Sequence, residues 1–341
     1  MAYSFKSKDY FNTILYTGNG GTQSVTGVGF QPDLVWNKRR TGANEHAWTD
    51  AVRGVTKSIF SSLNNAETTQ SGGLTAFDSD GYSVGNSGEF NDNSESYVGW
   101  NWKANGQGSS NTAGTINTTY TSANTTAGFS IIKYNGNGSA GATIGHGLGV
   151  APKLVIIKRT DTTSNWIFGS GALGFNKFLY LNNTDAATTN AGAFYDTAPS
   201  SSVITLGSWN DVNNASGTYV AYAWAEKIGF SKFGTYTGNQ NADGPFSYTG
   251  FKPAFLILRA TDSENWIMFD NKRDSYNVAD DLILPNQNIA AFTAANYVDF
   301  YSNGFKIRTN AVGGNASGQE FVYMAFGEEL VGTNNIPNTA R

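Results

Sequence analysis

Gly149-Val-Ala-Pro-Lys-Leu-Val-Ile-Ile-Lys-Arg159 is the stretch that decides the fold, because two related stretches occur elsewhere in the chain. The first is Gly29-Phe-Gln-Pro-Asp-Leu-Val-Trp-Asn-Lys-Arg39, and the more divergent third is Gly250-Phe-Lys-Pro-Ala-Phe-Leu-Ile-Leu-Arg-Ala260. In each, a proline follows the glycine after three residues and precedes a short apolar run. Proline lacks an N–H and tends to begin a strand, and an apolar run indicates a strand buried on both faces. The stretch therefore predicts a buried strand in each of three repeated units.

Further markers flank this stretch in every copy. A Tyr-x-Gly-Asn signature lies upstream, and a segment of alternating bulky residues lies downstream at nearly constant spacing. A tryptophan also follows each proline. Because several markers keep their order, the chain is a triple repeat. The signatures begin at Tyr16, Tyr134 and Tyr236, the alternating segments begin at Tyr97, Tyr219 and Phe321, and the tryptophans are Trp48, Trp166 and Trp266.

Each copy has the pattern of a β unit. Bulky residues at every second position predict a strand with one face against a core, and Asp80-Gly81 and Asn303-Gly304 predict hairpin turns. Six or seven short strands per copy predict an all-β fold of three tandem β-sandwich repeats, of the jelly-roll or lectin-like kind. The residues predicted to face the core are Val98, Trp100, Trp102, Val220, Tyr222, Trp224, Val322, Met324 and Phe326.

The markers divide the chain into three units with unequal connections. Residues 104–129 are rich in Gly, Ser, Thr and Asn, which predicts a flexible polar linker that holds one added strand. The second and third units join at residues 226–230 almost without a linker, so we expect them to pack directly. The predicted divisions are an N-terminal extension 1–13, repeats 14–103, 130–228 and 229–330, the linker 104–129, and a C-terminal tail 331–341.

The composition excludes several classes of function. Charged residues make up 14% of the 341 residues and aromatic residues 14%, so the chain is not a disordered polyelectrolyte. The 22 basic and 26 acidic residues give a net charge of −4, which provides no basic field for nucleic acid or anionic lipid. No apolar run approaches the length of a membrane helix, and the N-terminus carries no signal-peptide pattern.

The residues that could carry chemistry are few. The chain has no cysteine and two histidines, His46 and His146, which we interpret as solvated loop residues, so neither a metal site nor a cofactor is expected. The run Asp78-Ser-Asp-Gly81 is interpreted as a hairpin rather than a calcium loop, since no Glu follows at the required offset. The glycine-rich run from Gly136 to Gly145 precedes a strand and not a helix, which argues against a phosphate loop.

Catalysis is not expected either. Hydrolysis of a glycosidic bond needs two carboxylates that flank it, and the available acids occur in the first copy alone. We interpret them as surface loop residues and expect no enzymatic activity. These acids are Glu67, Glu89, Asp92 and Glu95.

One polar pair recurs and gives the candidate binding residues. Asp50 with Arg53 and Asp270 with Arg273 follow the marker tryptophan, whereas the second copy has Ser170 and Leu173 there. A loop-bracing ion pair is one interpretation. The other is a groove in which tryptophan stacks on a sugar and the charged pair binds its hydroxyls. The ligand-binding candidates are Trp48, Asp50, Arg53, Trp166, Trp266, Asp270 and Arg273.

Longer motifs extend over about residues 9 to 330. They are Tyr16-Thr-Gly-Asn-Gly-Gly21, Gly27-Val-Gly-Phe-Gln-Pro-Asp-Leu-Val-Trp36, Leu74-Thr-Ala-Phe-Asp-Ser-Asp-Gly81, Tyr97-Val-Gly-Trp-Asn-Trp-Lys103, Gly145-His-Gly-Leu-Gly149, Asp243-Gly-Pro-Phe246, Tyr276-Asn-Val-Ala-Asp280 and Ser302-Asn-Gly-Phe305. On these motifs the chain resembles a family of virion proteins from tailed bacteriophages, common in marine and cyanobacterial phages.

The resemblance implies a structural virion protein at the virion surface, made in the host cytoplasm. We expect a tail- or fibre-associated protein that contributes to attachment to host-surface glycan. The alternatives are a capsid-decoration or head-fibre protein that binds other virion subunits, and a polysaccharide depolymerase. The expected partners are other virion proteins and a host glycan, without nucleic acid or membrane insertion, and homo-oligomerisation stays open. Three similar units also suggest a pseudo-threefold arrangement that matches a threefold partner.

Overall fold

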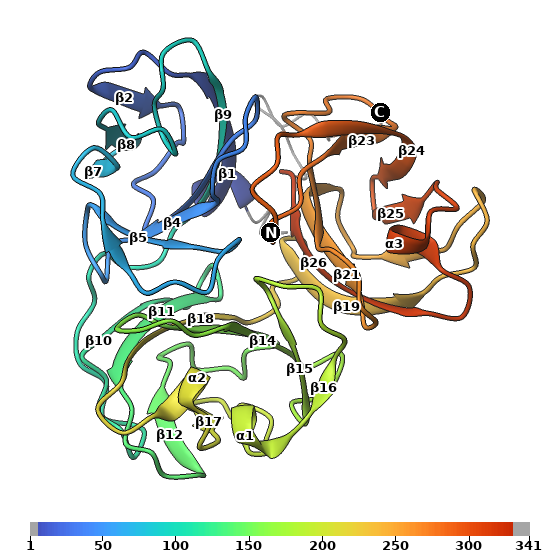
Figure 1. Cartoon of the computed structure of the whole chain (residues 1–341). Helices are drawn as coiled ribbons and strands as arrows, with labels where there is room; N and C mark the ends of the chain where they lie inside the picture. The colour runs from blue at the N-terminus through green and yellow to red at the C-terminus, as the bar shows by residue number, and fades with distance from the viewer. Residues whose placement is uncertain (1–5, 330–341) are drawn as a thin grey trace, which may run out of the picture.

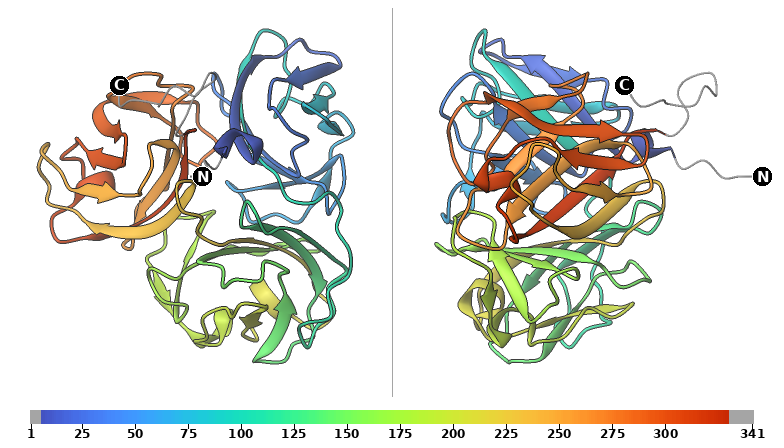
Figure 2. Two further views of the ribbon diagram at one scale, coloured as in Figure 1. Left: turned by 180° about the vertical axis from the view of Figure 1, so that it is seen from behind. Right: turned by 90° about the vertical axis from the view of Figure 1, so that its right-hand side faces the viewer.

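Three lobes surround a common centre in the computed structural model, which describes residues 6–329 (Figure 1). Views from behind and from the side show the same three lobes (Figure 2). The described chain is all-β, and its strands form antiparallel sheets with three short α-helices and one 3-10 helix. Within the described residues, none of the helices is long and apolar enough to cross a membrane.

Unit 1 contains a large and a small antiparallel sheet. The strand order is β1-β9-β3-β4-β5-β6 in the large sheet and β2-β8-β7 in the small one. Its elements are η1 (Ser7–Asp9), β1 (Phe11–Thr17), β2 (Gln23–Thr26), β3 (Leu34–Arg39), β4 (Ala47–Asp50), β5 (Lys57–Phe60), β6 (Thr68–Thr69), β7 (Leu74–Asp78), β8 (Gly81–Val84) and β9 (Ser96–Trp102).

Unit 2 repeats this plan with an additional edge strand. Its sheets have the orders β10-β11-β18-β13-β14-β15-β16 and β12-β17. Its elements are β10 (Tyr120–Asn124), β11 (Phe129–Asn135), β12 (Ala142–Gly145), β13 (Leu154–Arg159), β14 (Trp166–Ser170), β15 (Lys177–Tyr180), β16 (Thr188–Thr189), α1 (Ala191–Phe194), β17 (Val203–Leu206), α2 (Asn210–Asn213) and β18 (Thr218–Trp224).

Unit 3 has two four-stranded sheets. Their orders are β19-β26-β21-β22 and β20-β25-β24-β23. Its elements are β19 (Ser231–Thr237), β20 (Phe246–Tyr248), β21 (Pro253–Ala260), β22 (Ile267–Asp270), β23 (Ala279–Leu282), β24 (Phe292–Tyr301), β25 (Gly304–Ile307), α3 (Val312–Asn315) and β26 (Glu320–Gly327).

The large sheets share one topology. Four strands follow one another in the same order in each large sheet: β1-β9-β3-β4, β11-β18-β13-β14 and β19-β26-β21-β22. The strands that follow the marker prolines, β3, β13 and β21, are buried along nearly their whole length, as predicted. Their registers fix which residues are equivalent in the three units. The pairs Leu34↔Trp102, Leu154↔Trp224 and Phe255↔Phe326 occupy one position.

One apolar core is shared by all three units. It is crossed by aromatic contacts between units, with ring centroids 6.3 Å apart for Trp102 and Trp224 and 5.6 Å apart for Trp102 and Phe326. Such pairs add to the free energy gained from burial alone. The predicted alternation is confirmed, because this core contains Val98, Trp100, Trp102, Val220, Tyr222, Trp224, Val322, Met324 and Phe326.

Each unit also has a core of its own between its two sheets. In unit 2, Tyr134 and Ile157 of the large sheet pack in one buried cluster with Ile144 and Leu206 of the small sheet. Separate clusters occupy the same place in units 1 and 3. Side chains on the two faces of each large sheet therefore serve different cores, which explains why β3, β13 and β21 are apolar on both faces.

The Tyr-x-Gly-Asn signature forms a loop that is hydrogen-bonded to one buried asparagine. In unit 2, Nδ2 of Asn213 donates to Asn137 Oδ1 (3.2 Å), Ser139 O (2.9 Å) and Gly207 O (3.1 Å), and the Asn137 N–H donates to Asn213 Oδ1 (2.8 Å). The amide of Asn213 therefore holds the signature loop against the end of the small sheet. Equivalent hydrogen bonds occur in the other units. Asn91 Nδ2 donates to Asn19, Gly21 and Gly85 in unit 1, and Asn315 Nδ2 donates to Asn239, Asn241 and Thr309 in unit 3. The N–H groups of Asn19 and Asn239 donate back to these two side chains.

The predicted hairpins occur, and one of them uses its carboxylate structurally. Strands β7 and β8 enclose Ser79-Asp80, and β24 and β25 enclose Ser302-Asn303. Asp80 accepts from the N–H groups of Gly27 (3.1 Å) and Gly29 (2.7 Å) through its two carboxylate oxygens. Both glycines have positive φ, so the carboxylate fixes a loop that only glycine adopts without strain.

The first unit boundary differs from the prediction, because strand β1 begins at Phe11, inside the stretch 1–13 that we predicted to be an extension. The stretch 104–129 contains a strand, as predicted. Its start is bound to unit 1, because the buried Asp33 carboxylate accepts from the N–H groups of Ala104 (2.7 Å) and Gly106 (3.1 Å). Burial raises the pKa of Asp33 to about 6. Nine, nine and eight strands in units 1, 2 and 3 exceed the six or seven expected, and the two-residue strands β6 and β16 account for part of the excess. The tail 331–341 lies outside the described residues.

Candidate functional site

The three units contact one another head to tail, and each interface has a buried cation at one register position. Lys38, Lys158 and Arg259 all stand opposite a valine of the alternating segment. Lys158 donates from Nζ to Asn64 O of unit 1 at 3.3 Å, and Arg259 donates from Nη1 to Tyr180 O of unit 2 at 2.8 Å. Burial lowers the pKa of Lys158 to about 7, whereas the carbonyl oxygens around its Nζ favour the ammonium form.

Lys38 of unit 1 makes the third contact of this kind, because its Nζ lies 3.5 Å from Asn288 O of unit 3. A backbone hydrogen bond beside each cation repeats as well. These bonds run from Glu67 N to Thr160 O (2.9 Å), from Ala187 N to Thr261 O (2.7 Å) and from Ala291 N to Arg40 O (2.8 Å). The three units therefore close into a ring with pseudo-threefold symmetry, as the sequence suggested.

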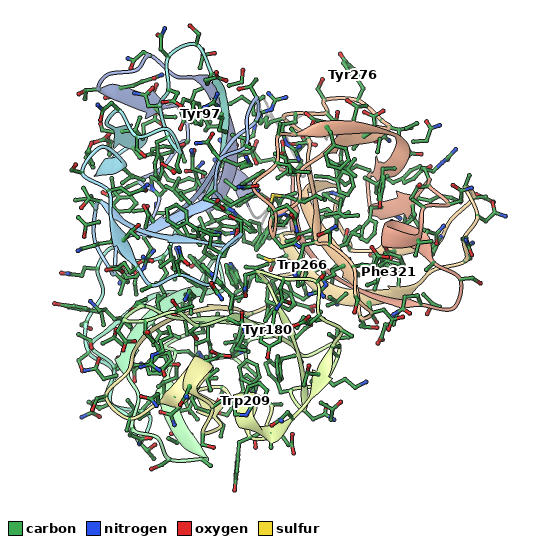
Figure 3. All side chains as sticks on the ribbon, in the orientation of Figure 1. Tyr97, Tyr180, Trp209, Trp266, Tyr276 and Phe321 are labelled. Carbon is green, nitrogen blue, oxygen red and sulfur yellow. The ribbon has the colours of Figure 1, made fainter. Side chains whose placement is uncertain are left out.

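The register corrects the predicted equivalence of the tryptophans. Trp166 and Trp266 are equivalent: Trp166 is the first residue of β14, Trp266 immediately precedes β22, and each donates its indole N–H to the preceding unit. Trp166 Nε1 donates to Phe60 O at 2.9 Å. Trp266 Nε1 donates to Tyr180 O at 2.9 Å, and Figure 3 labels these last two residues. In unit 1 this place is taken by His46, next to the backbone of Leu284 and Gln287. Trp48 instead shares its position with Phe168 and Met268, because the pairs Trp36↔Trp48, Ile156↔Phe168 and Ile257↔Met268 are equivalent.

The recurrent Asp–Arg pairs are buried at two of the interfaces. Asp50 Oδ2 lies 2.5 Å from Arg53 Nε and also accepts from the hydroxyl of Tyr222 in unit 2 at 2.7 Å. Asp50 Oδ1 accepts from the N–H groups of Val52 and Arg53. Burial opposes the charge on Arg53, but the Asp50 carboxylate raises the pKa of that guanidinium above its ordinary value. The carboxylate is thus fully hydrogen-bonded without a ligand.

The second pair copies this geometry with a different donor. Asp270 Oδ2 lies 2.6 Å from Arg273 Nε and accepts from Trp100 Nε1 of unit 1 at 3.1 Å. Trp100 and Tyr222 occupy the same register position, which in unit 3 is held by Met324. Methionine cannot donate a hydrogen bond. The unit that would present an Asp–Arg pair to it has Ser170 and Leu173 instead, so each interface has either both partners or neither.

All seven predicted ligand-binding residues lie inside the molecule. The side chains of Arg53 and Arg273 are 1% and 0% exposed, and the other five residues are at most 1% exposed. The geometry matches the alternative interpretation of the pairs as structural ion pairs, extended here to contacts between units. No groove exposes Trp48, Asp50, Arg53, Trp166, Trp266, Asp270 and Arg273 to a sugar.

Replacing Tyr222 by phenylalanine is expected to lower the free energy of unfolding by about 1.5–3 kcal/mol, since a hydrogen bond to a buried carboxylate is lost. Equilibrium denaturation in urea measures the change. Met324→Leu, at the same register position without a charged partner, is the control and is expected to cost less than about 1.5 kcal/mol. A cost of Tyr222→Phe below about 0.5 kcal/mol would show that this contact contributes little.

The prediction that both histidines are solvated is wrong, since each is 0% exposed. His46 lies at the interface between units 1 and 3, where burial and the nearby Lys38 lower its pKa well below 6.5. His146 accepts from Leu148 N at Nδ1 and lies 3.2 Å from Ser200 O through Nε2, and burial lowers its pKa. The hydrogen bond at Nδ1 requires the neutral ring. Both histidines are therefore neutral in the folded protein at pH 7.

Folding is expected to become less favourable as the pH falls below about 6.5, because the unfolded chain then protonates His46 and the folded chain does not. One such group removes about 1.4 kcal/mol by pH 5.5. Chemical denaturation at pH 7.5 and 5.5 measures the difference for the wild type and for His46→Gln. The difference should shrink in the variant by about that amount. An unchanged pH dependence would contradict the neutral, buried state of His46.

The acids of unit 1 are engaged in structural contacts. Glu67 lies 3.1 Å from Arg53, and Asp92 and Glu95 lie 2.7 Å and 2.6 Å from two nitrogens of Arg39. Glu89 accepts from Gln70 and Ser87. Among residues 6–329, no group of three or more His, Asp and Glu side chains could hold a metal ion.

Comparison with known proteins identifies a family for the chain. Residues 6–329 match a family model described as a domain of unknown function, DUF7483, and the chain therefore belongs to that family. The match covers all three units. No curated protein matches the chain.

Proposed function

We propose that this member of the DUF7483 family is a structural, non-enzymatic protein of a tailed-phage virion, placed on the tail and contributing to attachment to host-surface glycan. The observation that supports this is the closed ring of three similar units around one core. A ring with pseudo-threefold symmetry fits the axis of a threefold partner. The phage assignment itself rests on the sequence resemblance.

The build of the units supports a lectin-like role. Each unit has a large and a small sheet with a buried cluster between them, so we infer that each is a small β-sandwich of the jelly-roll or lectin-like kind. Rigid sandwiches present loops for binding. The part of the chain that is described forms a compact ring, which also favours the alternative of a capsid-decoration or head-fibre protein over an elongated fibre shaft.

Immunogold labelling of intact particles tests the proposal. Antibody against the purified chain is expected to label the tail, and purified protein is expected to compete with particles for adsorption to host cells. Labelling of the head would establish the decoration alternative. Particles that carry no label would overturn the virion assignment, and tail labelling without competition would overturn the attachment role alone.

A further inference from the structure

The interface between units 3 and 1 contains a cavity of about 380 Å³ at the surface. A charged pair crosses it, since Arg40 Nη2 of unit 1 lies 3.0 Å from Asp281 Oδ2 of unit 3. The half-exposed ring of Phe292, at 39% exposure, also lines it. The remaining lining side chains are small or carry hydroxyls: Thr41, Ser96, Ala290, Ala291 and Thr293.

The repeat provides an internal comparison for these three residues. The register pairs Lys57↔Thr69, Lys177↔Thr189 and Asp281↔Thr293 place an aspartate where units 1 and 2 have lysine. The pairs Ser58↔Thr68, Phe178↔Thr188 and Leu282↔Phe292 place a phenylalanine where they have threonine. Arg40 likewise occupies the position of Thr160 and Thr261, since the N–H groups of all three donate to equivalent carbonyls of Ser96, Thr218 and Glu320.

The backbone contacts of this interface do not require these side chains, because the other units make the same backbone hydrogen bonds without them. Phenylalanine in place of threonine leaves an aromatic ring 39% exposed, so a large part of its apolar surface stays in contact with water. Asp281 and Phe292 lie on the paired strands β23 and β24, and Arg40, which is far from them in the sequence, meets them at one cavity. Three departures from the repeat therefore coincide at one surface cavity, which makes it the candidate ligand site of this interface.

The chemistry of the cavity fits a saccharide. Asp281 accepts and Arg40 donates hydrogen bonds in adjacent directions, as two neighbouring hydroxyls require. Arg40 Nε is buried without a hydrogen-bond partner among the described residues. The exposed ring of Phe292 offers a surface for the apolar face of a sugar ring. Because Asp281 compensates the charge of Arg40, an uncharged sugar fits better than an anion.

Asp281 is also held in place from within. Its Oδ1 lies 3.5 Å from Arg273 Nη1, and the same nitrogen donates to Asp281 O at 2.6 Å. Arg273 is in turn bound to the buried Asp270. These contacts link Asp270 in the core to Asp281 at the cavity through Arg273. The Asp281 carboxylate is therefore positioned before any ligand binds, which lowers the entropy cost of binding.

We propose that the cavity formed by Arg40, Asp281 and Phe292 binds a neutral sugar through neighbouring hydroxyls. The proposal rests on the attachment function above and names its site. It makes the closed ring necessary for binding, since unit 1 contributes the arginine and unit 3 the aspartate and the aromatic ring.

Saturation-transfer NMR with glucose, galactose, mannose, glucuronic acid and sialic acid, followed by a glycan array of bacterial surface oligosaccharides, tests the proposal. The wild type is expected to bind at least one neutral sugar. Phe292→Thr and Arg40→Thr restore the residues of the other units, so they should fold, and each should weaken binding at least tenfold. Phe292→Tyr keeps the ring and should retain binding.

Tyr248→Ala is the matched control, because Tyr248 is 65% exposed on β20 and lines a different cavity. It should bind as the wild type does. Equal binding by Phe292→Thr and the wild type would overturn the site but leave glycan attachment standing. Loss of binding in Tyr248→Ala alone would move the site to the β20 cavity and overturn the proposal. Binding of the acidic sugars alone, or of none, would also overturn it, and the adsorption competition then decides separately whether the protein contributes to attachment.

Discussion

Replacing Arg53 by leucine is expected to lower the free energy of unfolding by about 3–5 kcal/mol, because the substitution leaves the Asp50 carboxylate buried without its cation. Tyr222 and two backbone N–H groups still donate to Asp50, but none of them carries a compensating charge. Equilibrium denaturation in guanidinium chloride, followed by tryptophan fluorescence, measures the loss.

The second unit supplies the control for this experiment. The double variant Asp50→Ser with Arg53→Leu gives unit 1 the residues that unit 2 has at Ser170 and Leu173. Removal of both charges of a buried pair is often close to neutral, so the double variant should be more stable than Arg53→Leu, although Tyr222 loses its acceptor. A double variant as unstable as the single one would show that the cost does not come from the unpaired carboxylate.

Replacing Asn213 by aspartate is expected to cost about 3 kcal/mol or more, the second large effect. The substitution exchanges the Nδ2 donor for a carboxylate oxygen that faces three acceptors, Asn137 Oδ1, Ser139 O and Gly207 O. Three hydrogen bonds are lost, and the acceptors are left unsatisfied or repelled in a buried place. Urea denaturation at pH 7 measures the loss.

Two comparisons make this result specific. Asn93→Asp changes an exposed asparagine in the same way and should cost less than about 0.5 kcal/mol. Asn91→Asp and Asn315→Asp should behave as Asn213→Asp does, since each amide makes equivalent contacts. If the three buried variants differed widely from one another, the signature would not have one common role.

The repeat and its strands could be predicted from the sequence because they depend on local patterns. Alternation at Val98, Trp100 and Trp102 indicates one buried face whatever that face contacts. The hairpins at Asp80-Gly81 and Asn303-Gly304 follow from turn chemistry. The role of the Tyr-x-Gly-Asn signature could not be predicted, because the asparagine that binds it lies 72 residues away in unit 1 and 76 residues away in units 2 and 3.

The contacts between units could not be predicted from the sequence, because they join residues that are far apart in the chain. Asp50 and Tyr222 are 172 residues apart, and the sequence around either residue does not indicate that the other is its hydrogen-bond partner. The sequence shows that the second copy lacks the Asp–Arg pair. That Met324 of the third copy takes the place of the missing hydrogen-bond donor is evident once the three units are seen to close into a ring. Spacing from the proline also misaligned Trp48 with Trp166. The pairs Leu34↔Asp50 and Leu154↔Ser170 span equal lengths of chain, so the two tryptophans stand two residues apart on equivalent hairpins.

The cavity of Arg40, Asp281 and Phe292 was likewise missed. A signal existed in the departures from the repeat at these positions, but aligning the copies there needs the ladder β23–β24, whose register is shifted by a bulge. The sequence pattern indicated tryptophan beside a charged pair as the binding site. That combination does occur in the molecule, but it stabilises the core, while the surface cavity uses a different pair and a phenylalanine.

The central claim is that the three units close into one ring, and the contact between Trp100 of unit 1 and Asp270 of unit 3 tests it most directly. A double-mutant cycle measures the cost of Trp100→Phe in the wild type and in Asp270→Ser with Arg273→Leu. The two costs are expected to differ by at least about 1 kcal/mol, because the partner of the indole is absent in the second background. Equal costs in the two backgrounds would contradict the closure of the ring.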